Sequence, residues 1–218
     1  MEVNRLLTTP QKQELANALS HGLGVLLGLV GTPLLLIQAY RTSNAYGIAG
    51  SAVFCFCLLL VFTASTAYHI AANPAVKHAL RVLDHISIYF KIAGTYTPFI
   101  LLFAFEGIGQ ALFWALWGLT LLGIVFKILL TNRFEKLSVG IYLAMGWSVV
   151  VLPSSFFAQI SGPILWFIIA GGLSYTLGVV FYAWKKMTYH HAIWHLWVLI
   201  GSLCHYTAVF IAVSRLPL

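Results

Sequence analysis

The sequence predicts an all-α fold, a bundle of seven transmembrane helices in a single domain. Of its 218 residues, 61% are hydrophobic and only 8% are charged, whereas soluble domains average roughly 25% charged residues. Seven apolar segments each approach the ~20 residues that a helix needs to cross the hydrocarbon core. The loops between them are short, so we expect one domain over residues 1–218. The predicted spans are residues 15–39, 46–71, 83–105, 109–130, 137–155, 163–184 and 192–213.

Local signals refine where these helices begin and bend. Thr9 followed by Pro10 is typical of an N-cap and a first helical residue. Asn73-Pro74 is a second start signal, ahead of the third span. Four further prolines are expected to kink or begin helices: Pro33, Pro98, Pro153 and Pro163.

The basic residues predict the orientation of the bundle. Nine Lys and Arg residues fall on the N-terminal side of the predicted membrane and two on the other side, while Lys91 lies inside the third span. The positive-inside rule therefore places the N-terminus in the cytoplasm and, after seven crossings, the C-terminus outside. These residues are scattered singly and form no basic stripe, so we expect no nucleic-acid partner. The nine are Arg5, Lys12, Lys77, Arg81, Lys127, Arg133, Lys136, Lys185 and Lys186, and the two are Arg41 and Arg215.

Polar and ionisable residues gather at the predicted cytoplasmic face. Such residues are rare in membrane spans because burying them is costly, so their presence there indicates a functional site. Each group lies at the start or end of a span on the same side of the membrane. The groups are Glu14-x-x-Asn17-x-x-Ser20-His21 in the first span, Ser65-x-x-x-His69 in the second, Asp84 in the third and His191-x-x-x-His195 in the seventh.

The histidines have the spacing of a metal site. His191 and His195 are four residues apart, so their imidazoles project from one helix face about 6 Å apart along the axis. His69 would supply a third nitrogen and leave the fourth tetrahedral position for water, as in catalytic zinc sites. Imidazole ligands without a thiolate favour Zn²⁺, with copper, iron and nickel as alternatives.

Asp84 is the predicted catalytic base. Ala192 follows His191, so this helix lacks the Glu of the His-Glu-x-x-His motif and another element must supply the carboxylate. Asp84 would accept a proton from a water molecule whose pKa the metal lowers. Ser65, one turn before His69, would orient the substrate or steady the site. Each also has a structural alternative: Ser65 can bond its own helix backbone, and Asp84 can cap the third helix or pair with Arg81.

Glu14, Asn17, Ser20 and His21 are expected to support the metal ligands from the first helix and not to react themselves. Glu14, Asn17 and His21 are offset by three and seven residues, which places them on one helix face. A structural network that ties the first helix to the bundle is an equal alternative for this stripe.

Together these motifs resemble the hemolysin III family, the bacterial branch of the progestin and adipoQ receptor group, which includes the adiponectin receptors. The resemblance covers nearly the whole chain and shows no departure at the expected metal ligands. The matching motifs are Glu14-x-x-Asn17-x-x-Ser20-His21, Ser65-Thr-Ala-Tyr-His69, Asp84-His85, Gly94-Thr-Tyr-Thr-Pro98-Phe99 and His191-Ala-Ile-Trp-His195.

This resemblance implies that His69, His191 and His195 bind zinc and that Asp84 contacts the water on the metal. The adiponectin receptors and the alkaline ceramidases of the same superfamily imply hydrolysis of a lipid amide. The bacterial branch implies a multi-pass protein of the bacterial inner membrane, and its name implies haemolysis.

Three functions follow as hypotheses. The first is an intramembrane zinc hydrolase that cleaves an amide or ester of a membrane lipid. The second is a non-enzymatic sensor or regulator of membrane homeostasis, in which zinc only clamps helices together. The third is a membrane-permeabilising haemolysin, which is disfavoured because the polar groups cluster at one face and form no continuous path. The identity of the substrate and the oligomeric state stay open.

Overall fold

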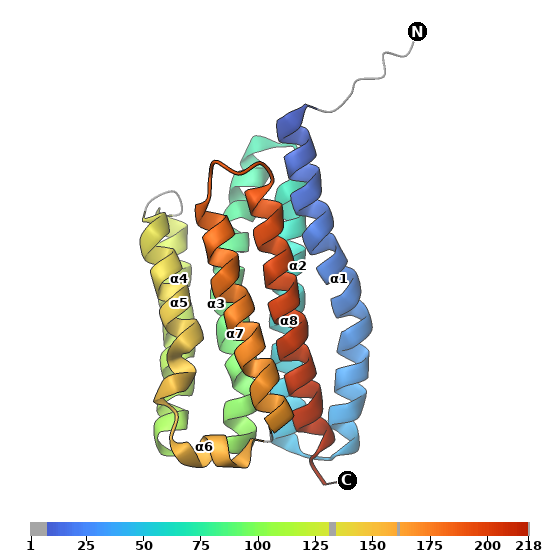
Figure 1. Cartoon of the computed structure of the whole chain (residues 1–218), viewed down its shortest axis with the longest axis vertical. Coiled ribbons are helices and arrows are strands. Elements are labelled where there is room, and N and C mark those ends of the chain that lie inside the picture. Colours follow the sequence, from blue (N-terminus) through green and yellow to red (C-terminus); the bar gives the residue numbers. More distant parts are fainter. Residues whose placement is uncertain (1–7, 131–133, 161, 218) are drawn as a thin grey trace.

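The computed structural model describes residues 8–130, 134–160 and 162–217. Within these ranges all secondary structure is helical and there is no β-strand, which confirms the all-α class. The long helices pack side by side along one long axis (Figure 1). In chain order they are α1 (Thr9–Arg41), α2 (Ala45–Ile70), α3 (Pro74–Phe103), α4 (Gly107–Leu130), α5 (Glu135–Trp147), the 3₁₀ helix η1 (Ser148–Val151), α6 (Ser154–Gln159), α7 (Gly162–Ala183) and α8 (His190–Ser214).

Six of the described helices are long and apolar enough to cross a membrane, namely α1, α2, α3, α4, α7 and α8. Their outer faces carry large exposed side chains such as Leu26, Leu122 and Trp166. Apolar surface of this extent is favourable against lipid and unfavourable in water. The chain is therefore a multi-pass membrane protein. α1 begins at one end of the bundle and α8 finishes at the opposite end (Figure 1).

The fifth predicted span, residues 137–155, is not one continuous helix. α5 ends at Trp147, η1 follows, and α6 starts only after Pro153 and lies across the lower end of the bundle in Figure 1. The Tyr96 hydroxyl of α3 donates to the Gly146 carbonyl (2.6 Å) and accepts from the Val149 N–H (2.8 Å). Non-helical backbone at membrane depth requires such partners inside the protein. Six continuous spans are present, and a seventh crossing remains a prediction.

Helix starts agree with the sequence signals to within a residue or two. Asn73 caps α3 as expected, because its Oδ1 accepts from the N–H groups of Ala75 and Val76. At α1 the N-cap is Thr8 and not Thr9, and the Gln11 side chain accepts from the Thr8 N–H.

Two prolines begin helices as expected: Pro153 is the N-cap of α6, and Pro163 lies in the first turn of α7. Pro33 and Pro98 lie inside α1 and α3, where a kink remains a prediction. α3 starts at Pro74, well before the predicted span at residue 83. Asp84 therefore lies inside this helix and does not cap it.

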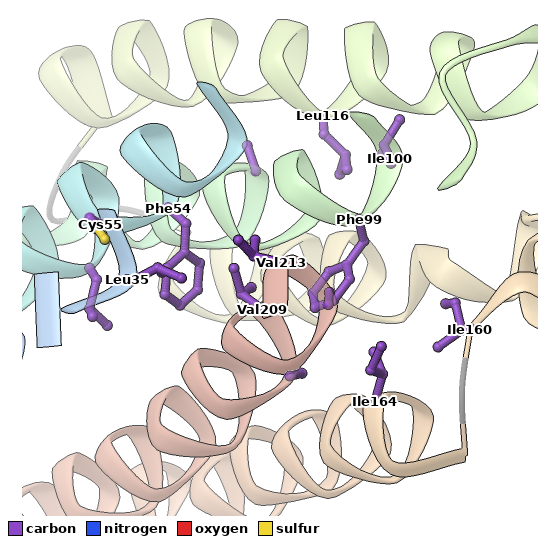
Figure 2. Packing of buried hydrophobic residues seen from close by; sticks show 14 of the residues in the cluster. Leu35, Phe54, Cys55, Phe99, Ile100, Leu116, Ile160, Ile164, Val209 and Val213 are labelled. Carbon is purple, nitrogen blue, oxygen red and sulfur yellow. The ribbon is translucent and has the colours of Figure 1, made fainter. Parts of the chain in front are cut away.

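A hydrophobic core holds together the helices that carry the predicted site. Figure 2 shows its packing. Close approach of α1 and α2 depends on Gly24, where a Cβ atom would lie 2.5 Å from the Phe62 ring. Buried residues of this core include Leu35, Phe54, Phe99, Ile100, Leu116, Val209 and Val213.

Candidate metal centre

Three histidines from two helices converge inside the upper end of the bundle. His69 ends α2, and His191 and His195 occupy the first two turns of α8. One ring nitrogen from each lies within 4.8 Å of those of the other two, a grouping that can hold a metal ion. A tetrahedral zinc site needs nitrogens roughly 3.3 Å apart, so a bound ion would draw the rings slightly together.

The free nitrogens of this cluster fit a metal. The Nε2 atoms of His69, His191 and His195 are all buried, and none has a hydrogen-bond partner among the described residues. Buried polar atoms are almost always partnered. A bound divalent metal ion would explain why these three neighbouring imidazole nitrogens lack partners, because it accepts their lone pairs.

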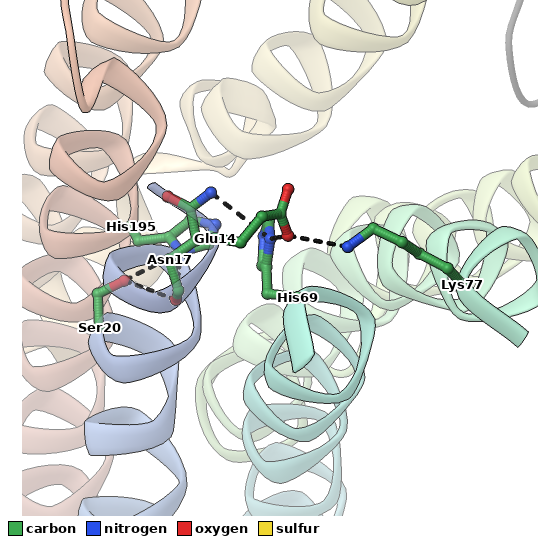
Figure 3. A network of polar contacts seen from close by, with 6 residues as sticks. All are labelled: Glu14, Asn17, Ser20, His69, Lys77 and His195. Atoms are coloured by element: carbon green, nitrogen blue, oxygen red, sulfur yellow. Dashed lines mark hydrogen bonds and ion pairs between the residues drawn. The ribbon is translucent and has the colours of Figure 1, made fainter. Parts of the chain in front are cut away.

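Residues of α1 hold two of these rings by their other nitrogen (Figure 3). His69 Nδ1–H donates to Glu14 Oε2 at 3.1 Å, and His195 Nδ1–H donates to the Asn17 carbonyl at 3.1 Å. These bonds place the proton on Nδ1 and leave Nε2 free to bind a metal, the usual arrangement for metal-ligating histidine. Ser20 Oγ lies 3.1 Å from the same His195 nitrogen.

His21 contacts the cluster in a different way. Its ring stacks on that of His195, with centroids 3.6 Å apart and planes inclined by 13°. Both His21 nitrogens are buried and have no hydrogen-bond partner in the described part of the chain. The predicted stripe on α1 therefore contains two kinds of contact: hydrogen bonds from Glu14, Asn17 and Ser20, and ring stacking from His21.

Asp84 and Ser65 lie together, and Asp84 lines the same cavity as His191, but neither belongs to the group of potential ligands. Both side chains are buried, and they are near enough to interact electrostatically. Ser65 Oγ nevertheless forms no hydrogen bond of acceptable geometry with any described residue, its own helix backbone included. None of the ion pairs in the described ranges involves Asp84, so the alternative of an ion pair with Arg81 is not present.

Two spaces of different character meet at the histidines. A small pocket of about 190 Å³ is lined by polar residues that include Gln13, Glu14 and His69. A larger cavity of about 430 Å³ runs into the bundle between α3, α5, α7 and α8. Asp84 lines the larger cavity, and His191 lines both spaces. His191 thus lies where a polar pocket and a mainly apolar cavity adjoin.

The mouth of the larger cavity is charged. Its lining includes Arg81, Glu135 and Lys185. The Tyr182 hydroxyl donates to Glu135, and together with Lys185 it holds the pKa of the Glu135 carboxyl below its ordinary value.

Two lysines were not predicted to belong to the site. Lys77 donates at 2.9 Å to Glu14 Oε2, the same oxygen that accepts from His69. Lys91 lines the larger cavity, one of the few charged residues within a span. The sequence signal for Lys91 was its position at mid-span, where a charged residue indicates function. Lys77 had no such signal, because it resembled any other basic loop residue.

Comparison with known proteins gives the family of this chain. Residues 10–206 match the family described as Haemolysin-III related. The chain belongs to the haemolysin-III related family. It is 39% identical over 206 residues to the Hemolysin-3 homolog of Bacillus subtilis (strain 168), an alignment that covers 94% of this chain and 97% of that protein. It is also 37% identical over 191 residues to Hemolysin-3 of Bacillus cereus, with 88% and 87% coverage.

A more distant similarity extends beyond bacteria. The Homo sapiens Monocyte to macrophage differentiation factor is 28% identical over 209 residues, which cover 93% of this chain and 85% of that protein. The matched region contains every helix that carries the histidine cluster except the last turns of α8. The alignments with these relatives thus cover most of the helical bundle.

Proposed function

We propose that this protein is a zinc-dependent hydrolase of the inner membrane that cleaves an amide or ester bond of a membrane lipid at the cytoplasmic end of the bundle. The observation that carries the proposal is the position of His191, which belongs to the histidine cluster and lines both a polar pocket and a mainly apolar cavity. Hydrolysis needs both water and a lipid at one point, and such a boundary supplies each from its own side.

His69, His191 and His195 would hold the metal. Zinc, when bound, lowers the pKa of water and polarises a carbonyl group. Glu14 and the Asn17 carbonyl keep the His69 and His195 rings in the orientation and tautomer that metal binding needs. Three potential protein ligands converge among the described residues, which leaves one position of a tetrahedral site for the reaction and favours a catalytic over a closed structural site.

Asp84 is the proposed base. Its buried carboxyl lines the cavity beside the cluster and has no ion-pair partner in the described ranges. It would take a proton from the attacking water and return it to the leaving amine or alcohol, so that one water is consumed for each amide or ester bond broken. Ser65, with its unpartnered Oγ, would orient the substrate carbonyl or the Asp84 carboxyl.

The test uses the full chain purified in lipid nanodiscs. We expect about one zinc per chain, loss of zinc in His191→Ala, and normal zinc in the exposed-histidine control His78→Ala. Ceramide and phospholipid substrates, with products followed by mass spectrometry, should be cleaved by the wild type. Asp84→Asn should keep its zinc and lose roughly 10²–10⁴-fold in rate, the usual contribution of general acid–base catalysis.

Two outcomes would contradict the proposal. If the wild type in lipid nanodiscs contains no metal, the proposed zinc site is wrong. If Asp84→Asn keeps full activity, Asp84 is not the base. Stable zinc without cleavage of any amide or ester lipid would instead favour a regulator in which zinc clamps α2 to α8.

A further inference from the structure

His21 of α1 carries two ring nitrogens that form no hydrogen bond with the metal ligands or with any other described residue. The residue is only 2% exposed. Buried polar atoms are almost always partnered, and leaving one unpartnered costs stability. A hydrogen-bonding group on the substrate would explain why these nitrogens lack a partner in the protein.

Aromatic rings hold His21 in place without hydrogen bonds. It stacks on His195 with centroids 3.6 Å apart and planes inclined by 13°. The Phe62 ring meets it edge to face at 5.1 Å between centroids, and the Trp194 ring lies at 6.5 Å. An apolar ring can pack against the same neighbours, so packing alone does not account for an imidazole at this position.

The stacking geometry separates His21 from the metal ligands. A neutral imidazole has one N–H donor and one acceptor nitrogen, and both act in the plane of the ring. Because the two planes are nearly parallel and the rings stack at 3.6 Å, a metal ion in the plane of His195 lies out of the plane of His21. His21 is accordingly absent from the group of potential ligands among the described residues. Its N–H points past the metal position and not at it.

His21 lies on the wall of the mainly apolar cavity. It lines this space of about 430 Å³ together with Asp84 and His191. It is not one of the described residues around the polar pocket of about 190 Å³. In the proposed function the lipid occupies the apolar cavity, so a donor on this wall meets the lipid and not the entering water.

We propose that His21 is a further catalytic residue, which donates a hydrogen bond to the carbonyl oxygen of the lipid amide or ester. This inference rests on the proposed hydrolase function. As water adds to the carbonyl carbon, the π electrons of the C=O bond move to its oxygen, and the His21 N–H stabilises this negative charge without giving up its proton. A donor that its neighbours already hold in place needs no reorganisation during the reaction. Asp84 carries the proton of the water to the leaving group, so His21 is unchanged after each cycle.

Two ketones of equal chain length test this role by equilibrium binding. The full chain is purified with zinc in phosphatidylcholine nanodiscs, and binding to empty nanodiscs is subtracted. The probe 1,1,1-trifluoro-2-tridecanone hydrates readily and then resembles the tetrahedral intermediate, whereas 2-tridecanone remains a ketone. The wild type should bind the fluorinated ketone at least about 100-fold more tightly, the low end for analogues of a transition state.

His21→Phe keeps an aromatic ring and removes both nitrogens. It should reduce the preference for the fluorinated ketone by roughly 10–100-fold, the effect of one hydrogen bond to a charged group. Its zinc content should stay at about one ion per chain, because the stack on His195 is retained. His21→Asn and His21→Gln each restore an amide donor near one of the two imidazole nitrogens, and at least one of them should recover part of the preference. If His21→Phe does not fold, His21→Leu replaces it as the variant without a donor.

A second buried histidine provides the matched control. His205 lines the same cavity and lies ten residues beyond His195 on α8, which is about 15 Å along the helix axis. His205→Phe should change the preference between the two ketones less than about twofold.

Three outcomes would overturn the inference. If His21→Phe keeps the wild-type preference, His21 does not contact the reacting carbonyl, and the hydrolase proposal still stands. If His21→Phe loses zinc together with the preference, His21 acts through His195 and not on the substrate. If the wild type shows no preference and cleaves no lipid, the hydrolase proposal and this inference are both wrong.

Discussion

Substitution of Glu14 by Gln isolates the support that α1 gives to the metal ligands. Glu14 Oε2 accepts from His69 Nδ1–H at 3.1 Å and from Lys77 Nζ at 2.9 Å. The His69 side chain is only 3% exposed, whereas that of Glu14 is 41% exposed. The His69 end of this hydrogen bond is therefore shielded from solvent, whereas solvent partly screens the Glu14 carboxylate.

The expected magnitude follows from this environment. A hydrogen bond to a charged group contributes about 1.5–3 kcal/mol, and a neutral one about 0.5–1.5 kcal/mol. Gln keeps an acceptor oxygen for His69 but not the charge, so the difference is about 1–1.5 kcal/mol, or a roughly tenfold weaker zinc affinity. Glu14→Ala removes the acceptor as well and should approach the 100-fold end of the range for such supporting residues.

Zinc affinity is measured by competition with a chromogenic chelator in nanodiscs. The matched control is Lys77→Met, which removes the outer ion pair and leaves the bond to His69. Because this pair is partly exposed, its loss should cost at most about 1 kcal/mol, less than about a fivefold change. The reasoning fails if Glu14→Gln binds zinc like the wild type, or if Lys77→Met weakens binding as much as Glu14→Ala.

Three further predictions concern stability. Tyr96→Phe removes the hydroxyl that satisfies two backbone groups of the interrupted fifth segment, and it should lower the free energy of unfolding by about 1–3 kcal/mol, measured by denaturant titration; an unchanged stability would contradict this role. Glu135 has a pKa held below its ordinary value mainly by Tyr182, so its stabilising contribution is present above the unfolded-state pKa and lost as pH falls through the folded-state pKa. The difference in Tm between wild type and Glu135→Gln should therefore vanish between about pH 7 and pH 3, and a constant difference would be inconsistent. Lys91→Met should keep or raise the Tm, because the Lys91 side chain is buried within a span and forms no ion pair with a carboxylate in the described ranges; a clear decrease would indicate that Lys91 stabilises the fold.

Most of the fold could be predicted because hydrocarbon selects long apolar helices, and such runs are visible in one sequence. The fifth segment could not, because its interruption depends on Tyr96 of another helix, whose hydroxyl compensates the broken backbone bonds. Pro153 marked a break but not the change of direction at α6.

The metal ligands were predictable to the extent that helix geometry determines them. Four-residue spacing places His191 and His195 on one face, and the basic loops place His69 at the same membrane level. The pairing of Glu14 with His69, and of His195 with the Asn17 carbonyl, depends on how α1 is rotated against α2 and α8. No periodicity in α1 specifies that rotation.

The central claim is that His69, His191 and His195 bind one metal ion and leave a position open. Anomalous X-ray diffraction at the zinc edge, from crystals of the full chain, tests it most directly. The account predicts one zinc peak between these three rings, with a non-protein oxygen as the remaining ligand and Asp84 beside it but not bound to the metal. A peak elsewhere, no peak in zinc-supplemented protein, or a fourth ligand from the protein itself would contradict it.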